Sequence, residues 1–133
     1  FAIKGIVLGS KGFLCYNLPQ LDGRSYYAMS ETAAILTRFE DILFFGKINN
    51  QWLHKVEGLA DDQYALFESS GKKQRVLLIY NEDNQKSCPF SIGLQGQNLK
   101  VYDAATDQLL PLNEGTFSGT VKPEDFNAYL IEE

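Results

Sequence analysis

The 133-residue sequence has few of the side chains on which catalysis and metal binding most often depend. It contains one histidine and two cysteines, Cys15 and Cys88, which are too few to complete a zinc site without carboxylates or to build a disulfide-rich miniprotein. Its 12 basic residues are outnumbered by 17 acidic ones, and a net charge of -5 disfavours nucleic acid and anionic membranes. Apolar runs such as 76–80 are far shorter than a membrane span. We therefore expect no cofactor, no metal, no nucleic-acid partner and no membrane partner.

The remaining composition is that of a folded domain. Hydrophobic residues make up 44% of the chain and charged residues 22%, and there are nine Phe, seven Tyr and one Trp. The first residue is Phe1 rather than methionine, and no basic segment followed by an apolar stretch of signal-peptide length begins the sequence. We interpret the chain as a fragment or a processed product of a longer protein.

The first 46 residues predict a strand followed by a helix. The apolar run 13–16 is bounded by Gly12 and Asn17, as expected for a parallel strand buried on both faces. Between residues 26 and 45 the apolar period becomes 3.6, which predicts one long amphipathic helix that ends before Gly46. The apolar face of this helix comprises Ala28, Met29, Ile35, Leu36, Phe39, Ile42 and Leu43. We interpret the neighbouring cluster Phe39, Phe44 and Phe45 as core packing.

After Gly46 the helical period ends, and short strand-like segments follow at intervals of roughly 8 to 12 residues. Such spacing is typical of an antiparallel sandwich or barrel, and the turn residues between the segments agree with it. Several segments alternate between polar and apolar residues, which predicts one solvated face, whereas the uninterrupted run 76–80 predicts a central strand. The predicted strands are 51–56, 63–68, 75–81, 90–94, 99–103, 108–112, 116–121 and 127–132.

We therefore predict a mainly β fold: an antiparallel β-sandwich of about seven or eight strands, preceded by a strand and a long amphipathic helix. Residues 1–46 form the strand–helix unit and residues 47–133 the sandwich domain. A lone parallel strand has no partner to pair with, so the first unit looks incomplete by itself. If it is part of a larger structure, its helix face lacks its natural cover in the isolated chain, and we expect that face either to associate with another copy or to dock on the sandwich.

The order of these elements resembles the carboxyl-terminal end of a TIM-barrel glycoside hydrolase that carries a C-terminal β-sandwich. Residues 9–17 are similar to a late barrel strand, and residues 27–45 are similar to the last barrel helix. The stretches 76–81, 99–103 and 121–131 resemble strands of such C-terminal domains. The resemblance implies a (β/α)8 barrel whose catalytic carboxylates lie on earlier strands, so no catalytic residue is assigned to this chain. It also favours a secreted or periplasmic protein over a cytoplasmic one.

The resemblance places Asn17 at the carboxyl end of a barrel strand, the face where barrel active sites form. Asn17, with Tyr16 and Asp22, is therefore the candidate substrate-binding set, and an ordinary strand end with a loop cap is an equal alternative. The implied partners are an oligo- or polysaccharide held by the parent enzyme, the rest of the catalytic barrel, and a second copy of the chain through the helix face.

Three other arrangements have simpler explanations. A Cys–His relay from Cys15 or Cys88 to His54 lacks any recognisable motif, so we expect incidental thiols. Acidic pairs such as 61–62, 82–83 and 124–125, and the loop 103–107, are expected to be turns. Exposed aromatic side chains could stack on sugars, although most occupy strand positions that a core would use. These candidates are Trp52, Tyr64, Phe67, Tyr80, Phe90, Tyr102, Phe117, Phe126 and Tyr129.

The sequence thus supports the C-terminal part of a glycoside hydrolase, in which the sandwich is an accessory domain with a structural role. A carbohydrate-binding module without catalytic activity is the alternative, and an independent enzyme is disfavoured because the sequence carries no recognisable catalytic constellation.

Overall fold

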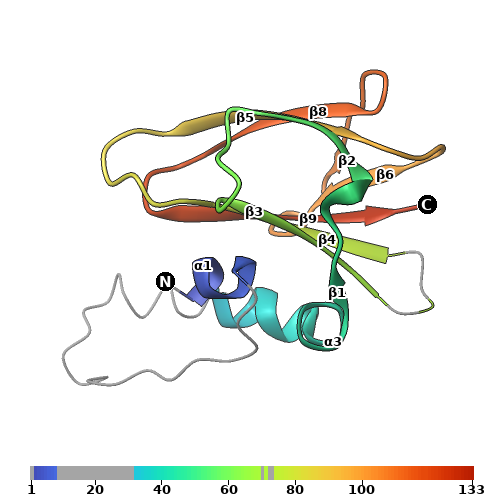
Figure 1. Cartoon of the computed structure of the whole chain (residues 1–133), viewed down its shortest axis with the longest axis horizontal. Helices are drawn as coiled ribbons and strands as arrows, with labels where there is room; N and C mark the ends of the chain where they lie inside the picture. Colours follow the sequence, from blue (N-terminus) through green and yellow to red (C-terminus); the bar gives the residue numbers. More distant parts are fainter. Residues whose placement is uncertain (1, 9–31, 70, 72–73) are drawn as a thin grey trace.

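The computed structural model describes residues 2–8, 32–69, 71 and 74–133, and these residues form three layers (Figure 1). Helices lie against one face of a central sheet, and a smaller sheet lies against its other face. The helical segments are α1 (Ala2–Val7), residues 32–38, α3 (Glu40–Phe45) and the short 3-10 helix η2 (Asn50–Trp52). The strands are β1 (Lys47–Ile48), β2 (Leu53–Glu57), β3 (Tyr64–Glu68), β4 (Gln74–Asn81), β5 (Cys88–Leu94), β6 (Lys100–Asp103), β7 (Leu109–Leu110), β8 (Thr116–Val121) and β9 (Asp125–Glu132).

The strands form two antiparallel sheets, which confirms the predicted mainly β sandwich. The larger sheet has six strands in the order β1-β3-β4-β9-β6-β7, and the smaller has three in the order β2-β5-β8. Each of the eight strands expected from the sequence is present, with ends that shift by a few residues. The additional strand is β1, whose two residues pair with Glu68 and Phe67 at the edge of the larger sheet.

Strand β4 occupies the centre of the molecule, as its uninterrupted apolar run predicts. It pairs with β3 on one side and β9 on the other, and its residues 75–81 are all buried. Leu77 faces the three-stranded sheet, whereas Leu78 faces the helices. Because both faces of this strand are covered, neither face needs polar side chains, and the alternation expected of a half-solvated strand disappears.

The solvated face predicted from alternation belongs to the three-stranded sheet. In β8, Phe117 and Val121 point into the sandwich and are buried, whereas Ser118 and Thr120 are exposed. His54 and Glu57 of β2 are exposed in the same layer. The six-stranded sheet has no comparable solvated face over its central strands, because the helices cover the side that the smaller sheet leaves open.

The long helix predicted over residues 26–45 is interrupted in its described part. Residues 32–38 and α3 are helical, but Phe39 between them has φ -111° and ψ 24°, outside the α-helical region. The amides of Ile42 and Leu43 both donate to the carbonyl oxygen of Phe39, at 3.0 and 2.9 Å, so the helix restarts at this residue. The prediction of one continuous helix is therefore wrong at Phe39.

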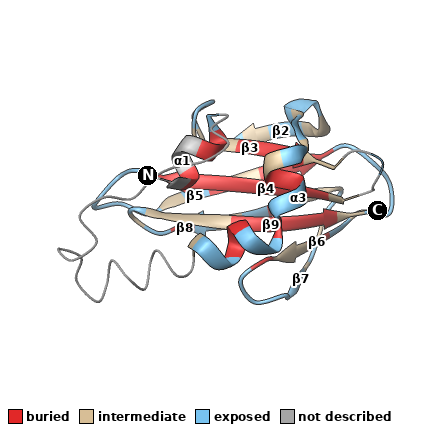
Figure 2. Ribbon diagram, turned by 90° about the horizontal axis from the view of Figure 1, so that it is seen from below, coloured by how far each residue is buried: buried red, intermediate tan, exposed pale blue. Residues whose placement is uncertain are grey.

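The apolar face of the helix docks on the six-stranded sheet, one of the two outcomes expected for it. Ile35, Leu36, Phe39, Ile42 and Leu43 are buried in one cluster that also contains residues of three strands. Those strand residues are Ala65, Phe67, Val76, Leu78, Tyr80, Ala128 and Leu130. Ile3, Ile6 and Val7 of α1, a helix that the sequence analysis did not predict, join the same cluster. Figure 2 shows this helix layer from its outer side.

The predicted barrel strand 13–16 lies outside the described residues, as does the helical stretch expected at 26–31. Within the described ranges, no helix is long and apolar enough to cross a membrane.

Candidate functional site

The three residues predicted to bind substrate, Tyr16, Asn17 and Asp22, lie outside the described residues. Their grouping at a barrel strand end stays a prediction. The features of the described residues that bear on function are a groove beside the helix layer, a buried arginine at one end of the sandwich, and a second hollow at the other end.

The groove runs along one flank of residues 38–45 and has a volume of about 610 Å³. Its helical side carries Arg38, Asp41 and Phe45, together with the buried Phe39 and Ile42. Ser69 and Gln74 line the groove from the ends of β3 and β4, and Leu130 of β9 lines it from the sheet. The groove therefore combines two aromatic rings, the buried Phe39 and the exposed Phe45, with several polar groups.

The interpretation of Phe39, Phe44 and Phe45 as core packing is wrong for Phe45. Phe39 is buried and Phe44 is half-buried against the core, but Phe45 is 77% exposed. The physical reason is its helical phase, since Phe45 lies outside the arc that Ile35, Phe39 and Ile42 turn toward the sheet.

Arg38 is held in place on the same flank. Its Nη1 donates to the backbone oxygen of Ala104 at 2.8 Å, and its Nη2 lies 2.7 Å from Oδ1 of Asp107. Its guanidinium carbon also lies 4.8 Å from the centroid of the Phe39 ring. These contacts orient the guanidinium and compensate its charge, so the helix is joined to the β6–β7 turn.

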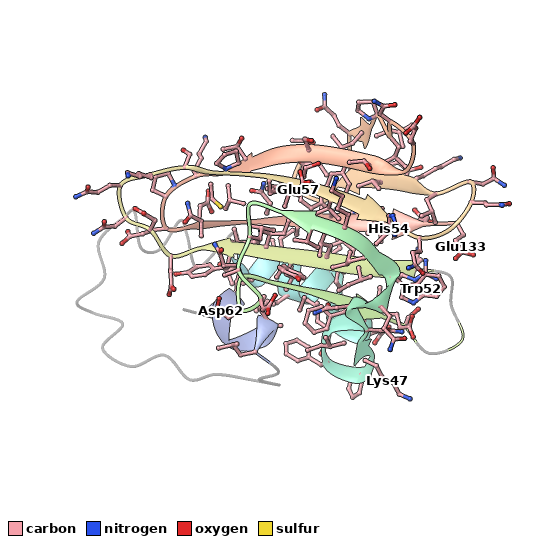
Figure 3. The ribbon with its side chains drawn as sticks, turned by 45° about the horizontal axis from the view of Figure 1, so that its top comes forward. Lys47, Trp52, His54, Glu57, Asp62 and Glu133 are labelled. Atoms are coloured by element: carbon pink, nitrogen blue, oxygen red, sulfur yellow. The ribbon has the colours of Figure 1, made fainter. Side chains whose placement is uncertain are left out.

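Arg75 forms a second polar cluster, at the end of the sandwich where Trp52 and Glu133 lie (Figure 3). Its guanidinium carbon is 3.8 Å from the centroid of the Trp52 ring, and its Nη2 lies 2.9 Å from Oε1 of Glu133. Glu68 accepts a 2.6 Å hydrogen bond from the Trp52 indole nitrogen and lies 3.9 Å from Nε of Arg75. Nε of Arg75 is buried without a hydrogen bond. At this end of the sandwich, the positive charge of Arg75 is therefore compensated by Glu68 and Glu133.

This cluster could not be predicted from the sequence pattern, because its members are distant in sequence. The sequence offers one signal, because Arg75 directly precedes the apolar run 76–80. A charge at a buried strand position needs partners, so this arginine indicates that oppositely charged groups lie nearby. The pattern alone does not reveal that Trp52 and Glu133 are its partners.

A smaller hollow of about 380 Å³ lies at the other end of the sandwich, near Asp62 (Figure 3). Asp83 accepts hydrogen bonds from the amides of Gln85 and Lys86, at 2.8 and 2.9 Å, and these bonds hold the pKa of its carboxyl below the usual value. Asp103 similarly accepts from the amide of Ala105 at 2.9 Å. These carboxylates organise turns, as predicted, and no group of three metal-ligating side chains occurs in the part of the chain that the structure describes.

The structure also separates Cys88 from His54. Cys88 pairs with Val121 at the first residue of β5, whereas His54 lies beside the opposite end of that strand, near Gly93 and Leu94. Five or more strand residues separate the two positions, a distance of about 17 Å. The Cys88 thiol donates instead to the backbone oxygen of Gly58 at 3.3 Å. These two residues therefore form no nucleophilic relay.

None of the nine strand-region aromatics considered for sugar stacking is fully exposed. Phe67, Tyr80, Phe90, Phe117 and Tyr129 are buried, and the other four are half-buried. Phe90, Phe117 and Tyr129 pack edge to face in the sandwich core, with ring centroids 5.0 to 6.1 Å apart. Burial raises the pKa of the Tyr129 hydroxyl to about 12. These rings stabilise the core rather than form an exposed platform.

Taken together, the described residues define a β-sandwich domain whose larger sheet carries a helix layer. No protein-family model matches the sequence, and no curated protein matches it. Among solved structures, the chain is similar to an Anoxybacillus α-amylase whose structure is described as providing insights into a new glycosyl hydrolase subclass. The TM-score is 0.57 at 14% sequence identity, over 85% of this chain and 23% of the α-amylase chain. The likeness shows a shared fold, and the chain spans about a quarter of the length of that protein.

Proposed function

We propose that this chain is the C-terminal part of a glycoside hydrolase, in which residues 47–133 form an accessory domain that supports a catalytic barrel. The observation that carries the proposal is the helix layer on the six-stranded sheet, because it joins the predicted last helix of a barrel to a sandwich in one shared core. The similarity to part of an α-amylase chain supports the same arrangement. The described residues contribute no nucleophile–base pair of their own.

In this proposal the barrel packs on the outer side of the helix layer. Ala33 and Thr37 are exposed there, pointing away from the buried Ile35 and Phe39, and Leu8 at the end of α1 is 63% exposed. Small side chains on the outer side permit close approach of a second helical layer. Tyr16, Asn17 and Asp22 would then belong to the substrate cleft of the barrel, and an oligo- or polysaccharide would reach this protein through that cleft.

The test uses the complete reading frame that encodes this chain. We expect that frame to encode the earlier strands and helices of a (β/α)8 barrel before Phe1, and we expect the longer protein, but not the 133-residue chain, to hydrolyse starch or aryl glycosides. A reading frame that encodes no such barrel would overturn the proposal.

A matched pair of substitutions tests the packing. Ala33→Arg should destabilise the longer protein by about 1–3 kcal/mol, because it overfills a packed interface, and should leave the melting temperature of the 133-residue chain unchanged. Ser118→Arg, on the solvated face of the smaller sheet, should leave both proteins unchanged. Equal effects of Ala33→Arg in the two proteins would place the barrel elsewhere.

A carbohydrate-binding module with a platform made by the nine aromatics is not favoured, because those rings are buried or half-buried. Among the described residues, the exposed aromatic ring lies elsewhere, at Phe45.

A further inference from the structure

We propose that the groove beside residues 38–45 binds a neutral oligosaccharide, with the exposed ring of Phe45 as its stacking surface. The ligand class rests on the proposed function, whereas the site rests on the groove itself. Its volume of about 610 Å³ lies within the range of small-ligand sites, and its described lining residues do not belong to the predicted cleft set Tyr16, Asn17 and Asp22.

Phe45 is the first element of the site. Nearby apolar residues of the helix, Ile42 and Leu43, are 6% and 0% exposed, whereas Phe45 is 77% exposed at the edge of a groove. A ring in this position contributes little to the folded core. Its face offers the C–H side of a pyranose an apolar surface, while the hydroxyls of the sugar extend to the polar groups beside it.

Arg38 and Asp41 supply these polar groups on the same flank of the helix. Bonds to Ala104 and Asp107 hold the Arg38 guanidinium, so binding costs little additional side-chain entropy. Asp41 makes no hydrogen bond or ion pair with the described residues, and its carboxylate oxygens can accept from hydroxyl groups. Donor and acceptor groups thus lie close to an aromatic face, the combination that a polyhydroxylated ligand requires.

The opposite wall is equally fixed. The side-chain nitrogen of Gln74 donates to Glu132 at 3.4 Å, and the hydroxyl of Ser69 donates to the backbone oxygen of Gln74 at 3.3 Å. Leu130 provides an apolar floor that is 8% exposed. Because these residues lie at strand ends and on a helix, the described part of the groove exists before any ligand binds.

The charges of the lining favour a neutral ligand over an anionic one. Asp107 compensates the Arg38 guanidinium at 2.7 Å, and Asp41 adds a negative charge. The described lining contains no other cationic side chain. A phosphorylated or sulfated ligand would therefore meet net repulsion, whereas hydroxyl groups would not.

The test is a titration of the 133-residue chain with maltoheptaose and, separately, cellohexaose, followed by backbone amide chemical shifts. We expect one of them to shift the amides of residues 38–45 and of Leu130. Phe45→Ala should weaken binding about tenfold, because the stacking surface is lost. Asp41→Asn, which keeps the size of the side chain and changes its acceptor strength, should weaken binding by a smaller factor.

The matched control is Leu109→Ala, which removes another exposed apolar side chain, 58% exposed in β7, and should leave binding unchanged. Absence of shifts with both sugars, shifts confined to other surfaces, or undiminished binding by Phe45→Ala would each overturn the proposal. None of these results affects the barrel test, because Ala33 does not line the groove. Failure of the barrel test would conversely leave a measured sugar affinity intact.

Discussion

The two faces of the six-stranded sheet are covered by different partners and are built from different residues. The face toward the smaller sheet is filled by large side chains, including the edge-to-face rings of Phe90, Phe117 and Tyr129. The face toward the helices contains Ala65 and Ala128 in the strands, together with Ala104 just after β6. Small residues let helices approach a sheet closely, whereas two sheets about 10 Å apart need bulk between them. The helix residues nevertheless share one buried cluster with this face of the sheet, so the helix layer is part of the core of the described fold.

The largest expected effect comes from removing the helix layer. A chain reduced to residues 47–133 exposes Val76, Leu78 and Leu130, which the helices bury at present. We expect this fragment to bind a hydrophobic dye, to associate in size-exclusion chromatography, and to lose a sharp thermal transition. A monomeric fragment with a transition like that of the whole chain would show instead that the predicted boundary at residues 46 and 47 separates two independent domains.

The next prediction compares the faces at neighbouring positions of one strand. Leu77 and Leu78 are both 0% exposed but point to the sandwich core and to the helix layer, respectively. Leu77→Ala and Leu78→Ala should each lower the free energy of unfolding by about 2–5 kcal/mol in urea denaturation. A cost below about 1 kcal/mol for Leu78→Ala alone would mean that the helices pack only loosely.

The smallest losses of unfolding free energy should come from substitutions of Arg75 in β4 and of Arg38 in the helix layer. Arg75→Met keeps an apolar stem over Trp52 but leaves Glu68 and Glu133 without their cation, so we expect a loss of about 1–3 kcal/mol. Arg38→Met removes a more exposed pair with Asp107, and less than about 1 kcal/mol should be lost. Equal losses in denaturant titrations of the two variants would contradict this ranking of buried and exposed ion pairs.

Most of the sandwich could be predicted from the sequence because its strands carry local signals. Alternation in residues 116–121, the uninterrupted run 76–80 and the intervening turns each depend on neighbouring residues. The two residues of β1 are too few to show any period. Helix α1 has Ile3, Ile6 and Val7 at helical spacing, but six residues do not distinguish a helix from a short apolar segment.

The candidate sites were harder to predict, because each combines distant segments. Arg75 meets Trp52 and Glu133 only after β4 pairs with β9 and the chain turns into β2. The groove similarly joins Asp41 and Phe45 of a helix to Ser69 and Gln74 at two strand ends. In the sequence, Phe45 appears as one member of an aromatic cluster, and its exposure becomes evident only when the buried arc of the helix is known.

Gly46 is the residue that connects the helix layer to the six-stranded sheet. Its amide donates to the carbonyl oxygen of Ile42, and the next two residues already pair with β3. A side chain at this position would collide with the backbone oxygens of Ile42 and Glu68. One residue thus connects the end of α3 to the start of β1, and there is no flexible interdomain linker between them. A barrel built on this helix would be mounted rigidly on the sandwich, so the two would turn together as a single mechanical unit.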